Sequence, residues 1–371
     1  MRKIMITVIF TIMFFSAADV YADEIDEQMK IYDFSDVSKI LRDTEDEYDI
    51  KFEDIVIKGA KGEIEFDYKK IGRYIVKKLF GEIYSYGKIM RNIIIICILS
   101  VLLKNMTGNF CTKEVSETAF YSCYMVMTGL LLSSFSAGLD IFKDCIAVIC
   151  ELTEAAVPLI TGVMMTSGVT GAGVFSPLLL GVVSVLTYVV KGIFIPLITL
   201  AAVITVINNI SQRDILTKLS EGIKSFVSTG IRWSAVIFMG FTVIQRIGST
   251  GINSAVNKSA KAVVNMVPMV GDVLSGAVES VIYWAESIKS GLCVAIVIAL
   301  SAICLIPVIK ITALIIIYKV TAIIIQPICD KRITNCIDSM GDHTSVILSA
   351  MTTVLVMFIF SIMTIMSISV I

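Results

Sequence analysis

Lys319 is the residue whose chemistry most needs an explanation, because it is the only charge within a long apolar run. The run extends from Leu314 to Tyr318 before it and from Val320 to Ile325 after it. An ammonium group near the middle of a membrane span costs about 2.5 to 3.5 kcal/mol unless water or a partner compensates it. The position therefore predicts a pore-facing or helix-pairing side chain. The alternative is an oblique segment in which Lys319 reaches the membrane surface along its aliphatic stem.

Glu151 and Glu154 are the carboxylates that the sequence offers as partners for this lysine. They are three residues apart, which places both on one face of a helix, and they adjoin a long apolar run. A carboxylate beside the ammonium of Lys319 would offset the cost of burying it. The alternative is that both glutamates belong to an ordinary charged loop.

The other reactive residue types do not form a pattern associated with catalysis or cofactor binding. His343 is the only histidine, so neither a His-based catalytic dyad nor a multi-histidine metal centre is expected. The nine cysteines contain no CxxC pair, which indicates small apolar residues rather than a metal site or a disulfide framework. The glycines between Gly168 and Gly173 follow no predicted strand, as a nucleotide-binding loop would require. We therefore expect no enzymatic activity, no cofactor, no metal and no nucleic-acid partner.

The composition places the elements that carry these residues in a membrane. Of 371 residues 56% are hydrophobic and only 17% are charged, whereas soluble domains are about 25% charged. We predict an all-α, polytopic α-helical membrane protein with about eight transmembrane helices, divided between a first part of the bundle at 92–247 and a second part at 291–371. The predicted spans are 93–110, 119–139, 174–190, 193–209, 231–247, 292–309, 310–328 and 345–368.

The N-terminus has the three parts of a cleaved secretory signal peptide, residues 1–22. Arg2 and Lys3 precede a short apolar core, and Val20 and Ala22 provide small or aliphatic residues before the cleavage site. The alternative, an uncleaved anchor, has too few apolar residues for the roughly 20 that a span needs. Cleavage would begin the mature chain at Asp23 and place residues 23–91 outside the cytoplasm.

Two segments of opposite charge follow the signal peptide. Residues 23–67 are acidic, with sparse apolar positions from which we expect little independent core. Residues 68–91 repeat apolar side chains at steps of three or four opposite a row of lysines and Arg73. That pattern predicts a basic amphipathic helix lying along anionic lipid headgroups. The alternative is a solvated helix that serves as a stalk.

Proline spacing subdivides the most apolar third of the chain. Pro158, Pro177 and Pro196 recur every nineteen residues, about one bilayer core of helix, which predicts that each proline begins a helix. The short apolar segment before the glycines at 168–173 suits a re-entrant or broken helix over 155–173. The alternative is a plain loop between helices.

The longest amphipathic stretch is 248–290, and it is interrupted near its middle. Pro268 removes a backbone donor, Gly271 relaxes the chain, and Asp272 is placed to cap the helix that follows. We expect two in-plane helices joined by an elbow at these residues, or, alternatively, a surface linker. With residues 23–91 outside, eight spans place this pair in the cytoplasm. They leave Arg213, Lys218, Lys224 and the basic helix at 68–91 outside, against the positive-inside rule.

The sequence around the elbow resembles that of a known family, stage III sporulation protein AE of endospore-forming bacteria. The resemblance covers most of residues 68–371, whereas residues 23–67 have no clear counterpart. The residues that carry it are Val267–Ser275 (VPMVGDVLS), Ala277–Val281 (AVESV), Pro307–Lys310 (PVIK), Tyr318-Lys319 and Gln326–Ile333 (QPICDKRI).

The resemblance implies a multi-pass subunit of a transport or secretion complex in the mother-cell membrane around the forespore. It also implies other stage III sporulation membrane proteins, a cytoplasmic ATPase and a forespore channel protein as partners. Such a complex would keep the forespore able to develop after engulfment. Two alternatives remain open: a stand-alone secondary transporter, in which Lys319 lies in the substrate site, and a structural membrane scaffold that recruits ring-forming partners.

Overall fold

The computed structural model describes residues 35–48, 52–61, 63, 67–105, 113–166, 169, 172–210, 216–264 and 271–367, and these residues form helices without a strand. The fold class predicted from the sequence is therefore confirmed as all-α. The predicted signal peptide, 1–22, lies outside the described residues. The helices are α3 (Ser35–Tyr48), α4 (Phe52–Ala60), α5 (Tyr68–Asn105), α6 (Lys113–Thr166), α7 (Ala172–Val189), the π-helix η1 (Val190–Phe194), α8 (Ile195–Ile210), α9 (Thr217–Val264), α10 (Gly271–Ile325) and α11 (Lys331–Met366).

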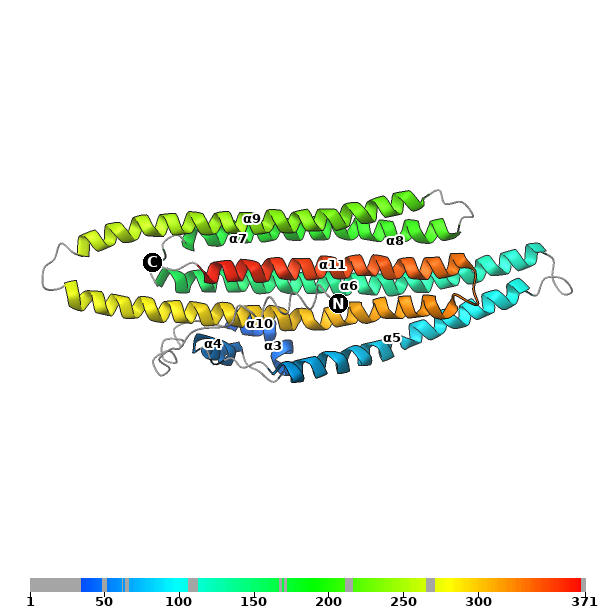
Figure 1. Cartoon of the computed structure of the whole chain (residues 1–371), viewed down its shortest axis with the longest axis horizontal. Helices are drawn as coiled ribbons and strands as arrows, with labels where there is room; N and C mark the ends of the chain where they lie inside the picture. Colours follow the sequence, from blue (N-terminus) through cyan, green and yellow to red (C-terminus); the bar gives the residue numbers. More distant parts are fainter. Residues whose placement is uncertain are drawn as a thin grey trace.

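The long helices lie side by side in an elongated bundle (Figure 1). The chain reverses direction after α5, α6, α8, α9 and α10, so that successive passes are antiparallel. The C-terminal ends of α5, α8 and α10 therefore lie at one end of the bundle, with the N-terminal ends of α6, α9 and α11. We call this the 330 end, after the connection between α10 and α11.

Six helices among the described residues are long and apolar enough to cross a bilayer, whereas the sequence pattern predicted about eight. They are Tyr68–Leu103, Glu117–Thr166, Pro177–Asn209, Thr217–Gln245, Ala285–Ile325 and Lys331–Met366. The number falls because two predicted pairs of spans are single passes. Residues 292–309 and 310–325, which make up the two predicted spans except for the last three residues, belong to α10, and the helix continues through Pro307 and Lys310. A helix of 55 residues is about 80 Å long, so it exceeds the roughly 30 Å hydrocarbon core of a bilayer.

The second merged pair contains a π turn instead of a break. Residues 174–190 and 193–209 form one pass through α7, η1 and α8. Within η1 the backbone N–H of Ile195 donates to the carbonyl of Val190, five residues earlier. Pro196 follows immediately and has no N–H to donate. The wider turn lets the chain pass the proline and remain helical.

The prolines do not begin the helices as their spacing predicted. Pro158 lies inside α6 and Pro177 inside α7. Residues 155–166, the first part of the predicted re-entrant segment, are the last three turns of α6. Neighbouring helices and a continuous apolar context can accommodate a proline within a membrane helix, so proline spacing alone does not mark helix starts.

The amphipathic stretch 248–290 is continuous with the spans on either side. α9 runs without interruption to Val264, and α10 begins at Gly271 and continues into the span. The helix bounds therefore differ from the predicted separate in-plane pair. Pro268 lies outside the described residues, while Gly271 and Asp272 are the first two residues of α10. The elbow at these residues stays a prediction.

The acidic N-terminal region contributes to the main core instead of forming a core of its own. Phe52 and Val56 of α4 are fully buried. α4 packs on α10 at a close contact between glycines, because a Cβ on Gly291 would lie 2.5 Å from the carbonyl oxygen of Val56 and 2.6 Å from the backbone nitrogen of Ala60. Only a residue without a side chain permits this approach.

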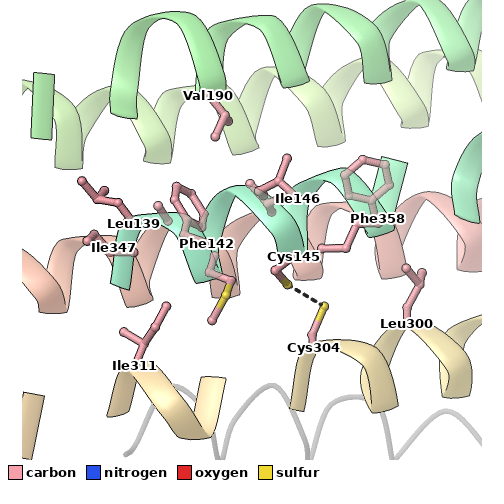
Figure 2. Close-up of a cluster of buried hydrophobic side chains, with 14 of the residues drawn as sticks. Leu139, Phe142, Cys145, Ile146, Val190, Leu300, Cys304, Ile311, Ile347 and Phe358 are labelled. Atoms are coloured by element: carbon pink, nitrogen blue, oxygen red, sulfur yellow. Dashed lines mark hydrogen bonds between the residues drawn. The ribbon is translucent and has the colours of Figure 1, made fainter. Parts of the chain in front are cut away.

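The centre of the bundle is apolar (Figure 2). Phe142 and Ile146 of α6 are buried together with side chains of α10, α11 and η1. Cys145 of α6 faces Cys304 of α10 with 3.6 Å between their sulfur atoms. Close packing of this kind fixes the register of α6, α10 and α11, and thereby the positions of the polar side chains that these helices carry.

Candidate functional site

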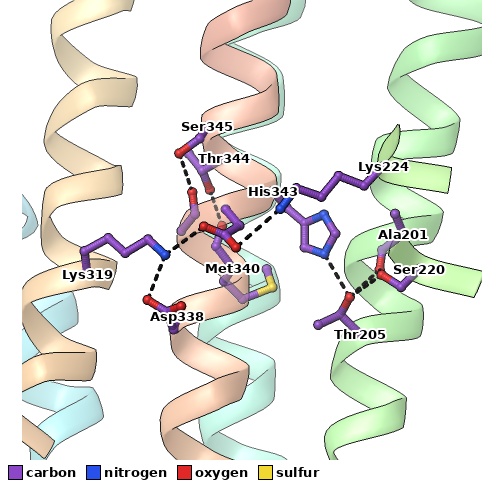
Figure 3. Close-up of polar contacts among 12 residues, drawn as sticks. Ala201, Thr205, Ser220, Lys224, Lys319, Asp338, Met340, His343, Thr344 and Ser345 are labelled. Atoms are coloured by element: carbon purple, nitrogen blue, oxygen red, sulfur yellow. Dashed lines mark hydrogen bonds and ion pairs between the residues drawn. The ribbon is translucent and has the colours of Figure 1, made fainter. Parts of the chain in front are cut away.

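Lys319 forms the centre of an ion-paired network near the 330 end (Figure 3). Its Nζ atom lies 2.7 Å from Oδ1 of Asp338 and 2.7 Å from Oδ1 of Asp342, both on α11. Nζ of Lys224, on α9, lies 3.3 Å from Oδ2 of Asp342. The network thus joins α9, α10 and α11 through two ammonium groups and two carboxylates.

The geometry of α11 presents both carboxylates to Lys319. Asp338 and Asp342 are four residues apart, so they lie on one face of the helix. Gly341 lies on the same side, and a Cβ there would be 3.2 Å from Cε of Lys319. The absence of a side chain at this position provides the space in which the lysine stem reaches the carboxylates. α11 starts two turns earlier, where the side chain of Asp330 accepts a hydrogen bond from the backbone N–H of Arg332 and caps the helix.

A second branch of polar contacts begins at the next residue of α11. Nε2 of His343 lies 2.8 Å from the hydroxyl of Thr205 on α8. The Thr205 hydroxyl is 2.5 Å from that of Ser220 on α9. The carbonyl oxygen of Ala201 accepts from this hydroxyl pair and lies 2.9 Å from the oxygen of Thr205 and 3.1 Å from that of Ser220. His343 is only 4% exposed, and the Thr205 hydroxyl provides a hydrogen-bond partner for its Nε2 atom.

Near the Thr205 contacts, Asn208 joins the end of α8 to the start of α9 by hydrogen bonds. Its amide group donates to the hydroxyl of Thr217 at 2.7 Å, and its carbonyl oxygen accepts from the backbone N–H of Leu216 at 2.9 Å. One buried side chain therefore satisfies polar groups at the start of α9. The contact holds α8 and α9 in the arrangement that brings Ser220 and Lys224 toward α11.

A cavity of about 240 Å³ opens between α8, α9 and α11, and its lining is almost wholly polar. Hydroxyl and amide groups alternate with charged groups of both signs, an arrangement suited to water or a small polar solute. Among the described residues no cluster of His, Cys, Asp and Glu side chains is placed to hold a metal ion. The lining residues are Thr205, Asn208, Asn209, Thr217, Ser220, Glu221, Lys224, Asn335, Asp338, Ser339, Asp342 and His343.

Tyr318, the neighbour of Lys319, fastens the other side of α10 to α6. Its hydroxyl lies 2.6 Å from the hydroxyl of Ser134, and Tyr318 is fully buried. Two adjacent residues of α10 thus make polar contacts in different directions, one to α6 and one to α11. Rotation of α10 about its axis would break both.

The carboxylates beside Lys319 are not the glutamates that the hydropathy pattern favoured as its partners. Glu151 and Glu154 lie on exposed parts of α6, and the carboxylates bound to Lys319 are Asp338 and Asp342. The expectation of a contact with the glutamates is therefore wrong. Hydropathy orders residues by depth in a membrane, but it does not say which helices are adjacent.

Sequence reasoning missed Asp338, Asp342 and Lys224, because it began the last span at Ser345. The helix begins fourteen residues earlier, at Lys331. The available signal is the spacing of Asp338 and Asp342, which puts two carboxylates on one helical face directly before an apolar run. A lysine isolated in the preceding apolar run could form an ion pair with the carboxylates on such a face.

The fold and the site together define a class of protein: a polytopic, all-helical membrane protein whose passes are joined by an ion-paired network. Comparison with known proteins identifies the family. The model of the stage III sporulation protein AE family matches residues 50–369, and this chain belongs to that family. The stage III sporulation protein AE of Bacillus subtilis (strain 168) is 26% identical over 285 residues, 76% of this chain and 71% of the relative. No solved structure matches.

Proposed function

We propose that this sporulation membrane protein is a multi-pass subunit of a transport or secretion complex between mother cell and forespore, needed for forespore development after engulfment. Its partners would be other stage III sporulation membrane proteins, a cytoplasmic ATPase and a forespore channel protein, and its place the mother-cell membrane around the forespore. The supporting observation is the Lys319 network within the candidate spans of a chain of this family. In this proposal the protein is not an enzyme.

The network would act by holding α9, α10 and α11 in one arrangement. Charged groups within membrane helices are costly, and they are typically associated with function. Lys319 binds two carboxylates of a neighbouring helix, and Lys224 binds one of them from a third helix. The burial of the two ammonium groups is costly, and the carboxylates of Asp338 and Asp342 offset that cost only when the three helices keep this register.

Complementation of a sporulating strain that lacks its own stage III sporulation protein AE tests this role. We expect Lys319→Met to reduce the yield of heat-resistant spores at least tenfold, and Lys319→Arg to retain part of it. Lys143→Met is the matched control, since Lys143 forms an exposed ion pair with Asp140 at 2.8 Å on the surface of α6. Immunoblots of membranes verify equal protein levels. A normal spore yield with Lys319→Met at wild-type abundance would refute the role.

Six passes also favour a sidedness in which the 330 end faces the cytoplasm. Six basic residues lie in the connections at this end or within two residues of its helix ends: Lys104, Lys113, Arg213, Lys218, Lys331 and Arg332. The connections at the opposite end, 167–171 and 265–270, have no basic residue so close to them. Basic residues in short loops favour the cytoplasm. This removes the conflict that eight spans created for Arg213 and Lys218, whereas the basic residues at the start of α5, such as Lys69 and Lys70, remain on the outer side.

The contact of α4 with α10 supports the same sidedness from a second direction. If residues 23–67 are extracytoplasmic, α4 and the portion of α10 around Gly291 lie toward that side. The stretch 248–290 then faces outward, opposite to the side expected from eight spans. An epitope tag inserted within 265–270 should be digested by protease added to protoplasts, and a tag within 211–215 should be protected. The reverse pattern would refute the assignment.

The polar cavity favours a second candidate, a stand-alone secondary transporter. Its volume of about 240 Å³ and its charged lining would accept a small polar solute. Reconstitution separates the candidates. Flux of small polar solutes into liposomes that contain this protein alone would support the transporter. Flux that requires the partner proteins would support the complex, and copurification with ring-forming partners without flux would support a scaffold.

A further inference from the structure

A second cavity lies between α10 and α5. Its volume is about 500 Å³, within the range of about 300 to 1,000 Å³ that is usual for ligand sites. The floor and walls are predominantly apolar, with Met90 on α5 and Ile316 and Val320 on α10. The full lining is Ile83, Tyr84, Gly87, Lys88, Met90, Arg91, Ile316, Ile317 and Val320. We call this cavity the α5–α10 groove.

Two cations border the apolar groove. Lys88 and Arg91 are three residues apart on α5, so they project from the same face of the helix. Both side chains are exposed, and neither forms an ion pair with a residue in the described part of the chain. The apolar run of α5 starts directly afterwards, at Ile93. Exposed basic side chains of this kind attract the phosphate group of an anionic lipid.

Gly87 leaves the groove open between its apolar and its cationic parts. A Cβ at this position would meet no other atom within 4 Å, so the space above the backbone is free. Tyr84, one turn earlier, is 88% exposed, which is typical of aromatic rings in the interfacial layer of a membrane. The groove therefore combines an apolar lining, open space above Gly87 and two exposed positive charges.

We propose that the α5–α10 groove binds an anionic phospholipid, with an acyl chain against Ile316 and Val320 and the phosphate group against Lys88 and Arg91. The apolar lining matches the chain, and the charges match the headgroup. A lipid also has direct access, because both helices are candidate membrane spans. The groove uses none of the residues of the polar network, so this inference stands or falls independently of the proposed role in transport.

Binding of fluorescent phosphatidylglycerol to the purified full-length protein in a zwitterionic detergent tests the site. Each basic side chain close to an anionic lipid contributes about fivefold to binding, so Lys88→Ala with Arg91→Ala should weaken binding about thirtyfold. Gly87→Leu should also weaken it, because the new side chain fills the trough. Phosphatidylcholine with identical chains should bind much more weakly, and soluble glycerol phosphate should not displace the bound lipid.

Two matched controls lie on the same helix. Arg73→Ala with Lys77→Ala removes the same charge outside the groove, and Gly81→Leu adds the same side chain at a glycine that also has open space around it. Gel filtration and circular dichroism verify folding, and Lys88→Gln alone replaces the double variant if the latter does not fold. Equal binding of phosphatidylcholine, equal loss in the Arg73/Lys77 control, or full binding by Gly87→Leu would each overturn the proposal.

Discussion

Removal of the charge on Lys319 should destabilise the bundle, and a double-mutant cycle with Asp338 should show why. Asp338 has no other ion pair within the described residues, so Lys319→Met leaves its carboxylate uncompensated. Asp342 retains its contact with Lys224 at 3.3 Å. The predicted perturbation is therefore a repulsion between two carboxylates on one face of α11, together with the loss of two short charge-assisted hydrogen bonds.

The magnitude follows from the separation and the exposure of the groups. Two carboxylates four residues apart on a helix lie about 6 Å from each other. Their repulsion is about 3 kcal/mol at an effective dielectric constant of 20. The side chains of Lys319, Asp338 and Asp342 are 35%, 49% and 45% exposed in the isolated chain, so screening lowers this value. We expect Lys319→Met to cost on the order of 1 to 2 kcal/mol of unfolding free energy.

Asp338→Asn should then offset much of the damage that Lys319→Met causes. Unfolding by sodium dodecyl sulfate in mixed micelles gives the free energy of each variant, and we expect a coupling energy of at least about 1 kcal/mol between the two positions. The control cycle pairs Lys143→Met with Asp140→Asn, an exposed pair for which about 0.5 kcal/mol or less is expected. A coupling energy at Lys319 no larger than that of the control would refute the reasoning.

Other features of the fold yield further predictions. Gly291→Ala would place a methyl group against the backbone of α4, so we expect a loss of about 1 to 3 kcal/mol of unfolding free energy and faster proteolysis between α4 and α5. The control, Gly162→Ala, has open space around it and should be neutral. Equal stability of the two variants would contradict the α4 contact. Mild oxidation should link Cys145 to Cys304, whose sulfur atoms are 3.6 Å apart, and peptide mass spectrometry that finds only reduced thiols would argue against the register of α6 and α10. N-terminal sequencing of the membrane-extracted protein should begin at Asp23, and an intact first residue would exclude the cleaved signal peptide.

The helical class of the fold could be predicted from the sequence, but the number of passes could not. The composition and the three- or four-residue periodicity were sufficient to indicate membrane helices. The predicted number of spans was too high because successive spans follow one another within continuous apolar sequence. Lys310 looked like a boundary between two spans, yet a single lysine with a long aliphatic stem does not interrupt a helix. Likewise, Pro196 suggested a new helix, and the π turn before it removed the need for one.

The sequence singled out Lys319 of the candidate site but not the residues that bind it. Lys319 stands out in the sequence because an isolated charge within a membrane span has a known insertion cost. Its partners depend on which helix lies next to α10, and that depends on side-chain packing between segments far apart in the chain. Asp338 follows Lys319 by 19 residues, beyond the end of α10, the connection 326–330 and the first two turns of α11, so a pattern search within one span could not reach it. The elbow at Pro268, Gly271 and Asp272 stays a prediction.

The contact between Lys319 and Gly341 has an evolutionary consequence. The lysine stem occupies the space that a methyl group at position 341 would need, with only 3.2 Å between Cε and the site of a Cβ. The two positions are therefore not free to vary separately. A homologue with a short side chain at position 319 can accept alanine or serine at 341, but one that retains a lysine or arginine should retain the glycine. An alignment of the family should thus show these two columns changing together, with the aspartates at 338 and 342 replaced only where the cation is lost.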